Sequence, residues 1–173
     1  IWGTQNGVTT KEAANSTGFT DVTTYDEMMA LEEGSRSFAQ FTNDLWTVEQ
    51  SDGNTPNLEQ MAEKAIDLLD DTDEGFFLMI EGAHIDKHSH SNEDDNMTQA
   101  LMEFDKTIEM VLEYAEKDGE TLVIITADHG GHARTHGLDI PEDMTIPISF
   151  YGPQWEAGRE LESVSLLNLA PTI

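Results

Sequence analysis

The chain has 173 residues, of which 38% are hydrophobic, a size and composition typical of one domain rather than a peptide or a tandem array. No stretch approaches the roughly eighteen unbroken apolar residues of a membrane-spanning helix, so we expect no membrane partner. The 35 acidic and 8 basic residues give a formal net charge of -27, which argues against nucleic acid as a partner, because phosphate-backbone binding depends on clustered Lys and Arg. The acidity identifies no site, since it serves solubility as readily as cation binding. The absence of cysteine excludes thiolate ligands, so any zinc must be held by imidazole and carboxylate.

Both ends of the chain look cut. The first residue is Ile1 rather than Met, and the chain stops at Ile173 directly after the apolar run 166–171. We therefore expect residues 1–173 to form a single partial domain of a longer protein.

The first 56 residues are rich in Thr, Ser, Asn and Gly. They are expected to be irregular and to depend on a partner for their structure, apart from a short helical candidate at residues 24–33. The regular patterns begin at residue 57, and residues 57–173 are expected to form the functional core.

Helical and strand-like patterns alternate in this core. Apolar residues recur with the 3.6-residue period of a helix from Leu58 to Leu69 and again from about Asn96 to Lys117, where Asp118-Gly119 closes the second helix. Continuous apolar runs, which are typical of strands buried in a parallel sheet, lie at residues 76–80, 122–125 and 146–151. The order predicts an α/β domain, with part of a largely parallel β-sheet flanked by helices.

Polar residues follow the first two of these predicted strands. The first strand leads into Glu81 and the stretch 84–90, and the second leads into residues 128–132. In open α/β sheets, ligands collect at the carboxyl ends of the strands. All six histidines lie between His84 and His136, a confinement that a site with several neutral imidazoles would explain.

Each of these residues also has an ordinary explanation. A single histidine at a strand end is more often a hydrogen-bonded surface residue than a ligand, and a lone aspartate there commonly caps the next helix. Together, however, they supply hard oxygen and borderline nitrogen ligands from several segments, which favours a metal site. The candidates are Asp86, His90, Asp128, His129 and His136. Three more histidines stay undecided between partners of the ligands and solvated bystanders, namely His84, His88 and His132.

Two segments closely resemble the alkaline phosphatase family. They are Gly-Phe-Phe-Leu-Met-Ile-Glu-Gly-Ala-His-Ile-Asp at residues 75–86 and Asp-Gly-Glu-Thr-Leu-Val-Ile-Ile-Thr-Ala-Asp-His at residues 118–129. The resemblance runs from about Leu58 to His129, includes the spacing Glu-x4-Asp-x3-His, and resumes at residues 150–153. The first 56 residues match only vaguely. The resemblance implies an alkaline phosphatase-like fold that is incomplete without its N-terminal half.

The resemblance also implies metal roles, for two zinc ions and one magnesium ion. The glutamate of the first motif binds magnesium in the family, the aspartate and histidine after it bind the first zinc, and the Asp-His pair after the second strand binds the second zinc. In this sequence these positions are Glu81, then Asp86 and His90, then Asp128 and His129. Lys87 occupies a position where some family members have a lysine that helps to hold phosphate through water, although an ordinary surface lysine would explain it equally well.

One expected ligand departs from the family pattern. Alkaline phosphatases complete the first zinc site with a histidine ten residues before the Tyr-Gly-Pro strand end, where this sequence has Pro141. The nearest histidine upstream is His136, at a spacing that resembles the nucleotide pyrophosphatase/phosphodiesterase branch of the superfamily. We predict His136 as the third ligand, with His132 as the alternative.

The family forms a phosphoserine or phosphothreonine on the enzyme and then hydrolyses it. No Ser or Thr in residues 1–56 lies in a recognisable Asp-Ser-Ala context. The nucleophile is therefore expected upstream, no catalytic nucleophile is assigned to this chain, and the chain alone should be inert.

Three functions remain open from the sequence. The first is hydrolysis of small phosphate monoesters, and the second is the reaction of a phosphodiesterase, nucleotide pyrophosphatase or phosphomutase of the same superfamily. The third is a non-catalytic acidic binding module. By family analogy the protein is expected to be periplasmic or extracellular and possibly a homodimer.

Overall fold

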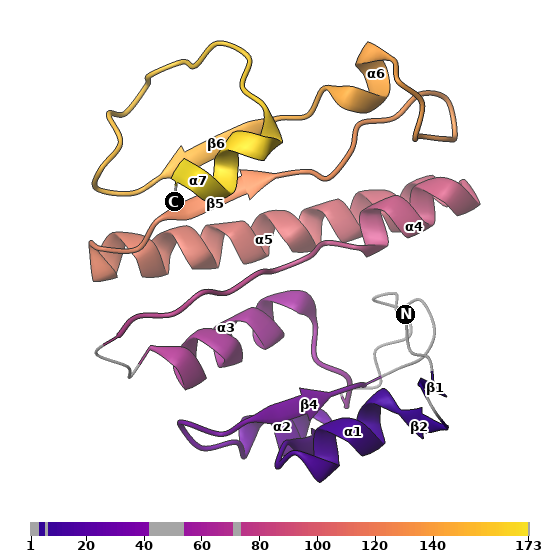
Figure 1. Cartoon of the computed structure of the whole chain (residues 1–173), viewed down its shortest axis with the longest axis vertical. Helices are drawn as coiled ribbons and strands as arrows, with labels where there is room; N and C mark the ends of the chain where they lie inside the picture. The colour runs from indigo at the N-terminus through magenta and orange to yellow at the C-terminus, as the bar shows by residue number, and fades with distance from the viewer. Residues whose placement is uncertain (1–3, 6, 42–53, 71–73, 173) are drawn as a thin grey trace.

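The computed structural model describes residues 4–5, 7–41, 54–70 and 74–172. Figure 1 shows the elements stacked along the long axis in roughly chain order. Short N-terminal elements lie at one end, the long helices α3 and α5 cross the middle, and the strands β5 and β6 lie beyond α5. Among the described residues, no helix is long and apolar enough to cross a membrane.

The N-terminal part contains more regular structure than the sequence led us to expect. The strand β1 (Thr4–Gln5) pairs antiparallel with β2 (Val8–Thr9), and β3 (Thr20–Val22) pairs parallel with β4 (Ser37–Ala39). Two short helices accompany these strands, α1 (Thr10–Ser16) and α2 (Tyr25–Met29), so the candidate at 24–33 is shorter than predicted. Both begin with a capping box, in which a threonine accepts from the glutamate N–H three residues on and the glutamate accepts in return. Residues 42–53 lie outside the described residues.

The two predicted long helices are present. The helix α3 (Leu58–Leu69) begins at the N-cap Asn57, and α5 (Asp94–Asp118) ends at Gly119, whose φ of 75° is the left-handed conformation that favours glycine. Between them lies the helix α4 (His84–Ser91), which contacts α5. The α3–α5 contact is fixed at one end by Tyr114, whose hydroxyl donates a hydrogen bond to the Asp70 carboxylate.

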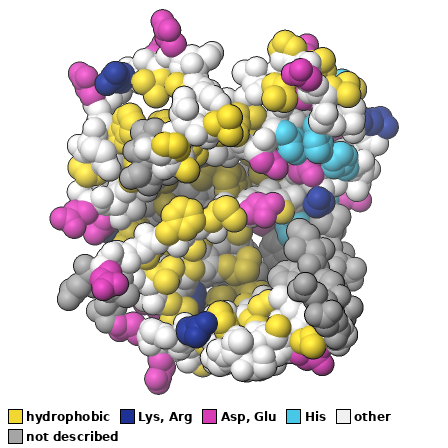
Figure 2. Space-filling model, in the orientation of Figure 1, with side chains coloured by type: hydrophobic (Ala, Val, Ile, Leu, Met, Phe, Trp, Pro, Cys, Tyr) yellow, Lys and Arg dark blue, Asp and Glu magenta, His cyan; other side chains and the backbone are white. Residues whose placement is uncertain are grey.

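The prediction of a strand at residues 76–80 was wrong for the described structure. This segment is extended but is not assigned to a sheet. Its side chains alternate, because Phe77 and Met79 are 83% and 77% exposed while Phe76, Leu78 and Ile80 are half-buried. One side of the segment is therefore covered and the other is open, whereas a buried parallel strand would be covered on both. Figure 2 shows hydrophobic side chains forming a band across the middle of the molecule.

The other two predicted strands form a sheet of their own. The strand β5 (Val123–Thr126) pairs antiparallel with β6 (Ile148–Tyr151), with Thr126 opposite Ile148. The short helix α6 (Pro141–Met144) lies in the connection between them, and the chain continues to η2 (Leu166–Asn168) and α7 (Leu169–Thr172). Because the pairing is antiparallel, the carboxyl end of β5 lies beside the start of β6, and the loop between the strands leaves and returns at the same edge.

Tyr114 provides a test of the α3–α5 contact. Burial, followed by the hydrogen bond to Asp70, raises the pKa of Tyr114 from 10.0 to about 12. The neutral phenol therefore stabilises the fold fully below about pH 10, and this contribution is lost as the pH rises toward 12. We expect the difference in unfolding free energy between the wild type and Tyr114→Phe to shrink between pH 9.5 and 12, measured by urea unfolding. A difference that stays constant over this range would contradict the assigned shift.

Candidate metal centre

The helix α4 sorts its histidines and its aspartate onto two faces. Asp86 and His90 are four residues apart and share one face, where the Asp86 Oδ1 atom lies 3.3 Å from the His90 Nε2 atom. His84 and His88 share the other face, with ring centroids 5.9 Å apart. His88 is 2% exposed and lies at the α4–α5 contact. The second pair therefore points toward α5, and the first pair, on the opposite face of α4, points away from it.

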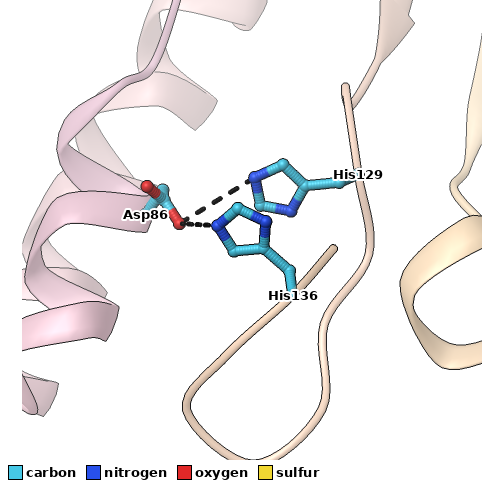
Figure 3. Close-up of side chains that lie close together, drawn as sticks. All are labelled: Asp86, His129 and His136. Carbon is cyan, nitrogen blue, oxygen red and sulfur yellow. Dashed lines mark ion pairs between the residues drawn. The ribbon is translucent and has the colours of Figure 1, made fainter. Parts of the chain in front are cut away.

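The loop that follows β5 brings two more histidines to Asp86. The rings of His129 and His136 stack at a centroid distance of 3.6 Å and an interplanar angle of 10°. Their Nε2 atoms lie 4.0 Å and 3.9 Å from the Asp86 Oδ1 atom. Figure 3 shows all three side chains converging, with Asp86 on α4 and the two histidines on the loop.

His90 lies beside these residues. Its Nε2 atom is 3.1 Å from the Nε2 atom of His136 and 3.3 Å from the Asp86 Oδ1 atom. A hydrogen on one of these nitrogens would make the contact a hydrogen bond, whereas two deprotonated nitrogens at this distance are favourable only with a cation between them. A tetrahedral zinc with bonds of about 2.0–2.1 Å separates its ligand atoms by roughly 3.3–3.4 Å. The spacings of 3.1–3.9 Å among the His90 Nε2, His136 Nε2 and Asp86 Oδ1 atoms therefore fit a zinc-sized cation after small side-chain movements.

The hydrogen bonds of His129 suit the role of a ligand. Its Nδ1 atom lies 2.7 Å from the carbonyl oxygen of Gly130, which can only accept, so the hydrogen is on Nδ1. The lone pair is then on Nε2, the atom that faces Asp86. Metal-binding histidines in proteins are commonly oriented by such a hydrogen bond on the other ring nitrogen.

His132 is held away from this cluster. Its Nδ1 atom is 2.7 Å from the Oδ1 atom of Asp143, a residue of α6 that is only 3% exposed. The hydrogen bond from His132 lowers the pKa of Asp143 below its ordinary value, although burial acts in the opposite direction. Of the two histidines between which the sequence left the choice, His136 joins Asp86 and His129, while His132 is engaged with Asp143.

His88 is likewise engaged with a carboxylate outside the cluster. Its Nδ1 atom lies 2.6 Å from the Oε2 atom of Glu93, which also accepts from Asn96 at 3.0 Å. These bonds, from Asn96 first and then His88, lower the pKa of Glu93. Since Glu93 and Asn96 flank the first turn of α5, this contact fixes α4 on α5.

The remaining predicted residues, His90 included, lie around the group of possible ligands without belonging to it. Within the described part of the chain, the group of possible ligands whose atoms lie within 4.8 Å of one another consists of Asp86, His129 and His136. Asp128 is adjacent, with an Oδ1 atom 3.7 Å from the His129 Nε2 atom, but its side chain is 91% exposed. Glu81 is exposed. The Lys87 Nζ atom lies 3.6 Å from the other Asp86 oxygen.

One residue of this region was missed by the sequence reasoning. Asp143 follows a proline at the start of α6, a position where an acidic residue is ordinarily explained by the helix dipole. Its pairing with His132, eleven residues earlier, is a tertiary contact that no local pattern marks.

Comparisons with known proteins identify the family of this chain. The model of the alkaline phosphatase family matches residues 5–156, so the chain belongs to the alkaline phosphatase family. The alkaline phosphatase of Escherichia fergusonii is 45% identical over 122 residues, which cover 64% of this chain and 26% of that protein. The chain thus spans about a quarter of the length of this relative.

Solved structures support the same fold. A cold-active alkaline phosphatase from a psychrophilic Shewanella species is 25% identical with a TM-score of 0.62, covering 75% of this chain and 33% of that one. The alkaline phosphatase of the Antarctic bacterium TAB5 is 27% identical with a TM-score of 0.61, covering 87% and 46%. The predicted fold class, a partial alkaline phosphatase-like α/β fold, is confirmed.

Two adjacent glycines of the loop make a matched test of its conformation. Neither has a positive φ, but a Cβ on Gly130 would collide with the carbonyl oxygen of Glu142, whereas one on Gly131 would lie 3.6 Å from its nearest neighbour. We expect Gly130→Ala to destabilise the fold by roughly 1–3 kcal/mol, because the backbone of α6 must shift. Gly131→Ala should change stability by less than about 1 kcal/mol. Urea unfolding measures both, and equal effects would mean that the loop does not approach α6 so closely.

Proposed function

We propose that the protein hydrolyses phosphate monoesters through two zinc ions and one magnesium ion, and that this chain supplies most of the metal ligands. The observation that supports the proposal best is the convergence of three imidazole Nε2 atoms on the Asp86 Oδ1 atom, from two segments far apart in the sequence. Membership of the alkaline phosphatase family supports the reaction. A variant of the TAB5 enzyme has been solved with magnesium bound, which supports the magnesium site.

The residues divide between the ions as the family resemblance implies. Asp86, His90 and His136 would hold the first zinc, and Asp128 and His129 the second. Glu81 would bind magnesium. Zinc pairs of this kind lower the pKa of a hydroxyl nucleophile or water and stabilise the leaving oxygen of an in-line displacement. Lys87, which lies beside Asp86, would help to hold the phosphate group.

The proposal concerns the whole protein, because this chain spans about a quarter of the relative that it matches. The serine or threonine nucleophile and the rest of the zinc and magnesium ligands are expected from the remainder. By analogy with the family, we also propose small phosphate esters as substrates, a periplasmic or extracellular location and a homodimer.

A diesterase remains a second candidate because of one specific observation. His136, rather than a histidine nearer to the Tyr-Gly-Pro strand end, joins Asp86 and His129. Its spacing from the Tyr-Gly-Pro strand end resembles that of the nucleotide pyrophosphatase/phosphodiesterase branch, so the first assay of the whole protein should offer both a monoester and a diester of nitrophenol.

Metal dependence is the main test of the proposed function. Hydrolysis of nitrophenyl phosphate by the whole protein should disappear after treatment with a chelator and return on addition of zinc with magnesium, because the ligand set consists of carboxylate and imidazole. Faster hydrolysis of the diester would favour the second candidate. Zinc binding without hydrolysis of either ester would favour a binding module, and full activity in chelator would refute the metal assignment.

The two faces of α4 provide a matched pair of variants. His90→Ala removes an Nε2 atom that lies 3.3 Å from Asp86, whereas His84→Ala removes an imidazole from the opposite face. We expect His90→Ala to weaken zinc binding at least tenfold and His84→Ala to leave it within about twofold, by competition with a chromophoric chelator. Equal zinc affinities for the two variants would remove His90 from the first zinc site.

A further inference from the structure

Three hydrogen bonds join Asp143 to the loop that follows β5, which contains His129 and His136. Its backbone oxygen accepts from the N–H of Gly130 at 2.8 Å, directly after His129. Its carboxylate accepts from the ring of His132 at 2.7 Å through Oδ1, and from the N–H of Leu138 at 2.8 Å through Oδ2. A single residue thus joins the beginning, the middle and the end of the segment that contains both loop histidines.

The carboxylate of Asp143 is also buried in an unusual way. Its side chain is 1% exposed, and the described residues that bond it are a histidine and a backbone N–H rather than a lysine or arginine. Burying a carboxylate is costly unless hydrogen bonds to it compensate, so the position is one where a neutral residue would ordinarily be favoured.

Capping of α6 does not account for this carboxylate. The helix α6 has only four residues, its N-cap is Ile140, and no side chain caps it. The hydrogen bonds of the Asp143 carboxylate go to the loop instead, at His132 and Leu138. Their effect is to close the loop, which brings His136 back over His129 at a ring distance of 3.6 Å.

We propose that Asp143 is a positioning residue of the metal centre: through His132, Leu138 and Gly130 it holds the loop in the conformation that presents His129 and His136 to Asp86. It does not bind the metal itself. The inference rests on the proposed function, because it assumes that these histidines bind zinc. His132 is then a link in the loop rather than a ligand, which explains why a histidine so close to the cluster lies outside it.

The decisive variant is Asp143→Asn, with Asp139→Asn as its control. An asparagine side chain keeps the size of Asp143 but replaces one carboxylate oxygen by an NH2 group, which would face the donor of either His132 or Leu138 and cannot accept from it. Asp139 is an exposed carboxylate of the same loop, so its variant removes the same charge. In the whole protein, we expect Asp143→Asn to weaken zinc binding about 10–100-fold, as is typical for residues that orient ligands. Asp139→Asn should change the affinity by less than about twofold.

The cobalt-substituted protein gives a readout that loss of stability alone would not move. Its visible d–d spectrum reports coordination geometry, and we expect it to change in Asp143→Asn and to stay that of the wild type in Asp139→Asn. Zinc affinity within twofold of the wild type together with an unchanged cobalt spectrum in Asp143→Asn would overturn the inference. Failure of the wild type to bind zinc would instead refute the proposed function.

A second pair of variants keeps the test valid if Asp143→Asn does not fold. His132→Asn retains an N–H donor near the position of the ring Nδ1, whereas His132→Ala removes the donor. If Asp143 acts through this bond, His132→Ala should weaken zinc binding and His132→Asn should largely restore it. Equal losses in the two variants would mean that the imidazole itself is needed, and the positioning role would be wrong.

Discussion

The Asp86 carboxylate is the point on which the proposed centre depends, because one of its oxygens faces imidazole nitrogens from two separate parts of the chain. His90 comes with Asp86 on α4, while His129 and His136 come from the loop after β5. Whether a proton or a cation joins these atoms, the backbone must hold them within reach of one another. Two hydrogen-bonded contacts contribute to that restraint. His88 with Glu93 fixes α4 on α5, and Asp143 closes the loop.

The helices could be predicted from the sequence because their signals are local. The 3.6-residue period and the glycine after Asp118 located α3 and α5 to within a few residues. The Thr-x-x-Glu capping box at Thr24 begins α2, which was predicted as the candidate at 24–33, and the same signal at Thr9 marks α1, which was not predicted. The segment 76–80 was different. A short apolar run indicates only that burial is favourable. Whether both faces of the segment are covered depends on other parts of the chain that pack against it.

The composition of the candidate centre could also be predicted, but its geometry could not. The confinement of the histidines and the spacing of Asp86 and His90 required no structure, since residues four apart on a helix share a face. The choice between His132 and His136 depended on Asp143, which lies beyond both of them in the sequence and contacts only one through its side chain. Glycine-flanked loops permit many conformations, and the sequence does not mark the residue that selects one of them.

The partners of Nδ1 differ between the histidines that face Asp86 and those that lie outside the cluster. Those that converge on the shared oxygen present Nε2 to it, and none of them has its Nδ1 atom on a carboxylate among the contacts described above. Of the three that lie outside the cluster, His88 and His132 have Nδ1 against a carboxylate, at 2.6 Å and 2.7 Å, while the ring of His84 lies 5.9 Å from that of His88. Because the chain is rich in carboxylates, an imidazole near a metal centre can form a hydrogen bond with a carboxylate that is not a metal ligand. Pairing His88 and His132 with Glu93 and Asp143 gives each a structural use and leaves Asp86 to the remaining rings. In the proposed centre, acidic residues outside the ligand set would thus leave His90, His129 and His136 available to a cation.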